Sequence, residues 1–95
     1  MARVRVTASA VEDLAMLTAS HGLPPDTGKR VSRRVRALRE FPLLGGALGG
    51  RYDGMRYVLG PWPWLLIVYE LREASNEVVV LALFDARSAT SPTNQ

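Results

Sequence analysis

Cysteine is absent from the chain, and histidine and lysine occur once each, as His21 and Lys29. Disulfide bonds and thiolate metal sites are therefore excluded, and a lone histidine without an acidic cluster does not suggest a metal. Long apolar runs are missing as well: the longest, Leu65–Tyr69 and Val78–Phe84, are far shorter than the ~20 residues that cross a bilayer. Residues 1–10 lack the apolar core of a secretion signal. We expect a soluble, cytoplasmic protein without metal or membrane contact.

Acidic residues are fewer than basic residues. Nine Asp and Glu residues face twelve Lys and Arg residues, which gives a net charge of +3. All the basic residues except Lys29 are arginines, whose rigid donor fork suits phosphate and carboxylate groups. The balance predicts an acidic partner, either a nucleic acid or an acidic protein. Charge alone does not choose between the two.

The N-terminal third begins with a strand pattern and continues with a helical one. Residues 3–7 alternate charged or polar and apolar side chains, as a strand with one buried face does. A helix is expected over about residues 9–20, with Ser9 as its N-cap and Glu12 completing a capping box. Its apolar stripe is formed by Val11, Leu14 and Leu17.

A second helix is predicted to begin at Asp26 or Thr27 and to end at Phe41-Pro42. Its apolar stripe faces the core, and the opposite face is strongly cationic. This cationic face has two interpretations, a solvated helix surface or a docking surface for acidic side chains or DNA phosphates. The arginines that we single out for partner binding on this helix are Arg33, Arg34, Arg36 and Arg39.

The remainder of the chain is predicted to form a loop over residues 43–54 and strands over 55–59, 64–71 and 77–84. The fold class is α+β in the order β-α-α-β-β-β, with a helical hairpin on one face of a twisted antiparallel sheet. Residues 1–87 form a single domain in this interpretation, and residues 88–95 form a flexible tail.

The last two predicted strands are apolar on both faces instead of alternating. A strand that is buried on both sides needs a cover on each. Because little chain remains to supply the second cover, we expect a partner protein or a second copy there. The alternative is that the sheet curls around its own helices.

This succession of elements resembles the RelE/ParE toxin superfamily over about residues 4–89. The N-terminal stretch is similar to the family's strand and helix with an Ala-x-x-(Asp/Glu)-Leu core. The middle resembles its Pro-x-x-Gly bend, and the end resembles its series of hydrophobic strands closed by H-x-x-R. The stretches that carry the resemblance are Val6–Leu14, Leu38–Gly45, Met55–Leu59, Leu66–Leu71 and Val78–Arg87.

The resemblance implies a bacterial growth-inhibiting toxin, of a kind also tied to plasmid stabilisation, that a cognate antitoxin neutralises. Some members of the superfamily cleave mRNA on the ribosome, and others poison DNA gyrase. The resemblance implies no cofactor. The Gly45-Gly46 and Gly49-Gly50 loop also lacks the flanking strand and Lys-Ser/Thr of a phosphate loop.

Ribonuclease members use several basic residues and a Tyr or His for acid–base chemistry and phosphorane stabilisation. At the matching positions this chain keeps Arg56 and Arg87, the catalytic candidates if it cleaves RNA. Val58 and Leu66 stand where two further basic residues are expected, and no tyrosine follows Arg87. The position of the closing histidine holds Phe84 or Asp85.

These departures favour the gyrase-poisoning branch. A ribosome-dependent mRNA interferase is the alternative, and a non-toxic interaction module is a second one. Arg51, Arg56 and Arg87 are candidates for contacting the target or a nucleic acid, although Arg87 has the alternative of pairing with Asp85 or Glu70. Trp62 and Trp64 join the four helix arginines as candidate antitoxin contacts, with the alternative that they cover the end of a hairpin.

Overall fold

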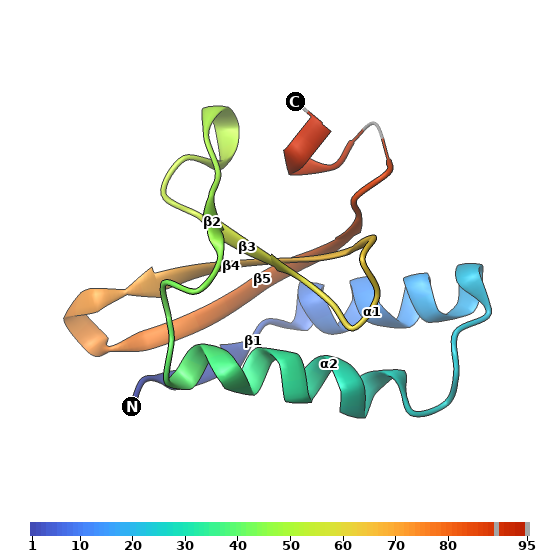
Figure 1. Ribbon diagram of the computed structural model, residues 1–95, viewed down its shortest axis with the longest axis horizontal. Coiled ribbons are helices and arrows are strands. Elements are labelled where there is room, and N and C mark those ends of the chain that lie inside the picture. The colour runs from blue at the N-terminus through green and yellow to red at the C-terminus, as the bar shows by residue number, and fades with distance from the viewer. Residues whose placement is uncertain (89, 95) are drawn as a thin grey trace.

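The computed structural model describes residues 1–88 and 90–94 and consists of two helices packed on one face of a five-stranded sheet (Figure 1). The α+β class and the order of the expected elements are confirmed. None of the helices in these described residues is long and apolar enough to cross a membrane. The helices are α1 (Ala8–His21) and α2 (Thr27–Arg36), and the strands are β1 (Arg3–Val6), β2 (Gly46–Ala47), β3 (Arg56–Leu59), β4 (Leu65–Arg72) and β5 (Glu77–Asp85).

The sheet is mixed, with the strand order β1-β5-β4-β3-β2. The pairs β2–β3, β3–β4 and β4–β5 are antiparallel, but β1 runs parallel to β5, with Val4 opposite Val78 and Val6 opposite Val80. The prediction of a wholly antiparallel sheet is therefore wrong for β1. Most of the chain lies between β1 and β5, so no hairpin fixes their relative direction. Strand β2 pairs with β3 inside the segment predicted to be a loop.

The N-cap of helix α1 lies two residues before the predicted one. Thr7 is the N-cap: its backbone is extended (φ −72°, ψ 158°), and its Oγ1 accepts a hydrogen bond of 3.2 Å from the N–H of Ala10. The prediction of Ser9 as N-cap is wrong, because Ser9 already lies in the first turn. The helix ends at Gly22, whose left-handed conformation (φ 59°) favours glycine. Helix α2 begins at Thr27, as predicted, and a 3₁₀ turn, Ala37–Arg39, extends it.

The main core lies between the two helices and the sheet. Side chains from β4 and β5 point toward the helices and are fully buried, among them Tyr69, Leu65 and Val78. Burial of apolar surface of this kind is the dominant favourable term in folding. The helices and the 3₁₀ turn contribute Ala10, Leu17, Val31, Val35 and Leu38 to the same core.

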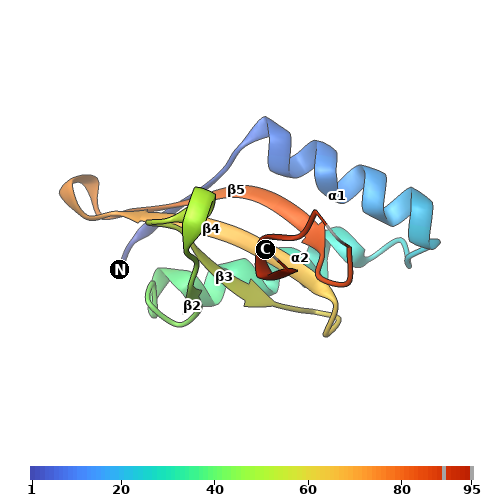
Figure 2. The ribbon, with the colours of Figure 1, turned by 90° about the horizontal axis from the view of Figure 1, so that it is seen from above.

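A second, smaller core covers the opposite face of the sheet. Leu66 and Val68 are 0% and 1% exposed on that face. The segment around β2 and the C-terminal segment both lie there, on the side away from the helices (Figures 1 and 2). The expectation that this face needs a partner or a second copy is therefore wrong for these residues. The side chains that pack on them are Leu48, Tyr52, Met55, Tyr57, Phe84 and Ala86.

The C-terminal segment follows β5. Ser91 is 0% exposed, Pro92 is buried, and Pro92–Asn94 form a 3₁₀ turn. The flexibility expected for residues 88–95 stays a prediction, as does the domain boundary at residue 87, and residues 89 and 95 lie outside the described residues.

Candidate functional site

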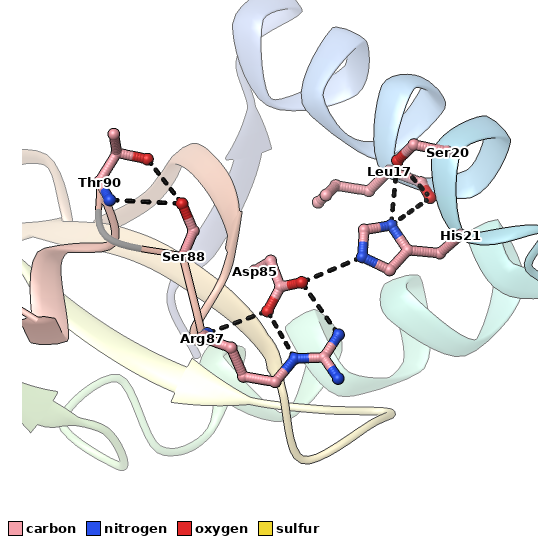
Figure 3. A network of polar contacts seen from close by, with 7 residues as sticks. All are labelled: Leu17, Ser20, His21, Asp85, Arg87, Ser88 and Thr90. Carbon is pink, nitrogen blue, oxygen red and sulfur yellow. Dashed lines mark hydrogen bonds and ion pairs between the residues drawn. The ribbon is translucent and has the colours of Figure 1, made fainter.

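Arg87, just after β5, folds back onto Asp85 (Figure 3). Nε of Arg87 lies 3.0 Å from Oδ1 of Asp85, Nη2 lies 2.9 Å from Oδ2, and the backbone N–H of Arg87 donates to Oδ1 at 2.9 Å. These bonds from Arg87 hold the pKa of Asp85 well below its ordinary value, and Asp85 in turn raises the pKa of Arg87. The pairing of Arg87 with Asp85, one of the two alternatives weighed from the sequence, is what the structure contains.

The same carboxylate contacts the end of α1. Nε2 of His21 lies 3.0 Å from Oδ2 of Asp85, while Nδ1 lies 3.1 Å from the carbonyl oxygen of Leu17 (Figure 3). His21 thus links the last turn of α1 to the end of β5. Among residues 1–88 and 90–94, no three His, Asp or Glu side chains group as metal ligands would.

Trp62 and Trp64, at the turn between β3 and β4, stack on each other and contact His21 and two arginines. The imidazole of His21 stacks on Trp64 with 4.5 Å between ring centroids, and the two indoles lie 6.1 Å apart. The guanidinium of Arg87 lies 5.0 Å from the centre of Trp64, and that of Arg30 lies 5.8 Å from the centre of Trp62. The indoles therefore close the end of the hairpin against α1 and α2, which was the alternative to partner contact.

Arg56 braces the segment between α2 and β2. Its Nη2 donates to the carbonyl oxygens of Leu43 and Gly45, and its Nε is buried without a hydrogen-bond partner in the described chain. The buried hydroxyl of Tyr69 donates to the carbonyl oxygen of Pro42 at 2.8 Å and accepts from the N–H of Gly45 at 3.1 Å. Both side chains hold the same backbone, so the observed contacts of Arg56 are structural.

The structure does not bring the two catalytic candidates together. Arg56 is paired with Tyr69 of β4, whereas Asp85, which holds Arg87, is paired with Leu65. Leu65 and Tyr69 are four residues apart in β4, or about 13 Å along the strand. Arg51, the third candidate for contacting a target, is exposed on the 3₁₀ turn Gly50–Tyr52, 5.9 Å from the ring centre of Tyr52.

The helix arginines divide into two groups. Nε of Arg34 donates to the carbonyl oxygen of Leu59 at 2.8 Å, so this side chain holds the end of β3. Arg33, Arg36 and Arg39 instead line a groove together with Lys29. The predicted binding set of Arg33, Arg34, Arg36, Arg39, Trp62 and Trp64 is therefore not one surface.

The groove has a volume of about 1110 Å³ and lies between α1 and α2, above β1 and β5. Val6 and Val11 are 46% and 57% exposed in it, although Val11 was assigned to the core stripe of its helix. The prediction for Val11 is thus wrong, because α2 does not close over this side of α1. The further residues that line the groove are Arg3, Val4, Ala10, Leu14, Gly28, Val31, Ser32, Val35, Val80 and Leu83.

Comparison with protein-family models and with curated proteins gives no match. Comparison with solved structures gives several that cover nearly the whole chain. A chain of the RelBE2 toxin–antitoxin complex from Mycobacterium tuberculosis has a TM-score of 0.69 and 24% identity, over 88% of this chain and 96% of that one. The isolated RelE toxin of E. coli has a TM-score of 0.68 and 11% identity, over 95% and 89%. The fold is that of the RelE/ParE toxins.

A chain of the ParDE toxin–antitoxin system of P. aeruginosa shares the RelE/ParE fold to a similar degree, with a TM-score of 0.67 and 17% identity over 92% of this chain and 98% of that one. RelE-type and ParE-type structures therefore match about equally well, so the likeness does not separate the two branches.

Sequence reasoning missed the groove of this RelE/ParE fold. The signal available was Val11, which was assigned to the buried stripe of the first helix although Ala10, Leu14 and Leu17 already supply apolar side chains for the core. Val11 proves to be exposed in the groove. An apolar face wider than its core contact requires is a pattern that predicts a second contact surface.

Proposed function

We propose that this chain is the toxin of a type II toxin–antitoxin pair, that it acts in the cytoplasm, and that a cognate antitoxin neutralises it. The observation that carries the proposal is the likeness of nearly the whole chain to the E. coli RelE toxin and to chains of RelBE and ParDE toxin–antitoxin systems. The groove with its basic rim supports an acidic protein partner.

We further propose DNA gyrase as the target. The resemblance to the ribonuclease branch requires cations where this chain has Val58 and Leu66, and these side chains are 4% and 0% exposed, in opposite cores of the sheet. Arg56 and Arg87 are both engaged with the chain itself, at different ends of β4. Without an assembled set of cations, stabilisation of a phosphorane has no source in these residues. A toxin that binds its target and traps it needs no such set.

Induction of the chain in a bacterial host, with DNA and protein synthesis followed separately, tests the proposal. We expect DNA synthesis to stop first and co-expression of the antitoxin to restore growth. Purified protein should inhibit supercoiling by gyrase at micromolar concentration and accumulate cleaved DNA. Unchanged supercoiling contradicts the gyrase proposal. Cuts at specific codons in translated mRNA would establish the alternative of an mRNA interferase. If growth is unimpaired, the alternative of a non-toxic interaction module is the one that remains.

Substitution of surface arginines locates the contact with gyrase. Arg51→Ala and Arg87→Ala should each weaken inhibition by about tenfold, the effect of losing one good charged contact. Arg5→Ala is the matched control, because Arg5 is a surface arginine of β1 that lies 3.6 Å from Glu77. Equal inhibition by all three variants would remove Arg51 and Arg87 from the target surface.

A further inference from the structure

We propose that Asp13 of α1 keeps the outer edge of β5 closed to a second copy of this chain. When α1 moves off that edge, the uncovered part of β5 would pair with the same part of another molecule. The task assigned to Asp13 does not depend on the proposed function or on a particular target. It explains a carboxylate that forms no ion pair within residues 1–88 and 90–94.

Strand β1 covers only the first part of β5. Their parallel pairing ends at Val6 and Val80, whereas β5 continues to Asp85. Strand β4 pairs with β5 on its other side from end to end, so the edge without a neighbouring strand comprises residues 81–85. Unpaired N–H and C=O groups on an edge of this kind are a template for pairing with another chain.

Helix α1 lies along this edge in place of a strand (Figure 2). Its N-cap residue Thr7 donates through Oγ1 to the carbonyl oxygen of Leu81 at 3.2 Å. One turn and a half further on, Oδ2 of Asp13 accepts a hydrogen bond of 3.0 Å from the backbone N–H of Leu83. The histidine–aspartate contact described above fastens the last turn of the helix to the end of β5. Side chains therefore bond groups that a further strand would otherwise bond.

The sequence of β5 indicates which molecule would occupy an open edge. Residues 78–84 are Val-Val-Val-Leu-Ala-Leu-Phe, an apolar run without charge, proline or glycine. Segments of six or seven residues with high β-propensity and low charge pair readily with identical segments of other molecules. Because every copy of the chain carries this run, a second copy is the partner that the edge fits.

The carboxylate of Asp13 closes the edge in two ways. Its oxygen occupies the N–H of Leu83, so this donor is not available to an incoming strand. Its charge would also be buried without a partner if another molecule paired there, and such burial is costly. Leu83 is 5% exposed and Asp13 is half-buried, so the contact lies at the border of the core. Inward-pointing charges and covering helices both protect sheet edges.

Amide hydrogen exchange tests whether Asp13 closes the edge. Asp13→Ala should lower the protection of the Leu83 amide by about tenfold or more, because a hydrogen bond to a charged acceptor is lost. Asp13→Ser, too short to reach the N–H of Leu83, should do the same, whereas Asp13→Asn keeps a side-chain oxygen and most of the protection. Glu12→Ala is the matched control, because Glu12 is the exposed carboxylate next to Asp13 on the same helix.

Sedimentation velocity and thioflavin T fluorescence follow the association of copies. Asp13→Ala and Asp13→Ser should associate at a concentration about tenfold lower than the unchanged chain does. Asp13→Asn and Glu12→Ala should behave like the unchanged chain. Leu81→Lys, at a half-buried position outside both cores, should suppress the association of Asp13→Ala, because identical strands would bring like charges together.

Tyr69→Phe separates an open edge from a general loss of stability. It removes the hydrogen bonds of a β4 hydroxyl, away from the outer edge of β5, and leaves Asp13 in place. At equal stability in urea unfolding, Tyr69→Phe should associate less than Asp13→Ala. The proposal is overturned if the Leu83 amide is protected equally in Asp13→Ala and Glu12→Ala. Association of Asp13→Ala no stronger than that of the unchanged chain or of Tyr69→Phe overturns it as well.

Discussion

The guanidinium of Arg87 donates to both carboxylate oxygens of Asp85, and the backbone N–H of Arg87 donates to the same group. Because His21 contacts that carboxylate from the end of α1, a single aspartate joins the turn after β5 to the helical layer. Arg87 remains 64% exposed, so Asp85 holds this side chain in one orientation while leaving much of it accessible.

The Asp85 pair gives a pH-dependent prediction. The pKa of Asp85 is depressed in the folded chain by Arg87, so its contribution to stability is present above the ordinary carboxyl pKa and is lost as the pH falls below it. The difference in unfolding free energy between the unchanged chain and Asp85→Asn should shrink as the pH falls below about 4. Urea unfolding at several pH values measures it.

An Arg87→Ala background provides the control for this series. Since Arg87 is the main cause of the depressed pKa, removing it should take away most of the pH dependence of the Asp85→Asn effect. A pH trend of equal size in both backgrounds would show that Arg87 is not responsible.

The cap of α1 gives a second prediction. Thr7→Ala should lower the free energy of unfolding by about 1 kcal/mol, because the N–H of Ala10 loses its acceptor. The bond from Oγ1 of Thr7 to the carbonyl oxygen of Leu81 is lost as well. Ser9→Ala should change stability by less than about 0.5 kcal/mol, as exposed substitutions usually do. A larger loss from Ser9→Ala than from Thr7→Ala would restore the capping box predicted from the sequence.

The hydroxyl of Tyr69 gives a third prediction. Tyr69→Phe leaves the carbonyl of Pro42 and the N–H of Gly45 without this partner, at a cost of about 1–3 kcal/mol. Tyr52→Phe is the comparison, because the ring of Tyr52 is half-buried and packs edge-on against Phe84. Denaturant unfolding that gives both variants the same stability would contradict the bracing role of Tyr69.

Gly45 gives a fourth prediction. A Cβ at this position would clash with the carbonyl oxygen of Tyr57, so the backbone itself must move. Gly45→Ala should therefore cost about 1–3 kcal/mol, the range for overpacking. Gly49→Ala meets nothing within 4 Å and should leave the thermal midpoint nearly unchanged. Equal midpoints for the two variants would show that the segment adapts freely.

Local patterns predicted the elements well, and long-range contacts were predicted less well. The alternation in β1 and the helical spacing of Val31 and Val35 depend on neighbours in sequence, so they could be recognised directly. The two-residue strand β2 could not, because Gly46 and Ala47 carry no alternating pattern. The parallel pairing of β1 with β5 joins the two ends of the fold, and no short segment contains that information.

The candidate site was predicted only in part, because local spacing can be recognised in the sequence and long-range packing cannot. Arg33 and Arg36 lie on α2 and Arg39 on the 3₁₀ turn that extends it, so their common surface followed from helical spacing. The contact of Arg34 with Leu59 and those of Arg56 with Leu43 and Gly45 depend on how distant segments pack. The apolar character of both faces of β4 was read correctly from the sequence. The sequence did not reveal that the chain itself covers the second face of β4.

The second cover of the sheet bears on how the chain would respond to a partner. Because Leu48 and its neighbours shield Leu66 and Val68 internally, the sheet stays dry whether or not another molecule is attached. Binding of a partner is therefore not needed to complete the fold of this face, and loss of a partner would leave both cores intact.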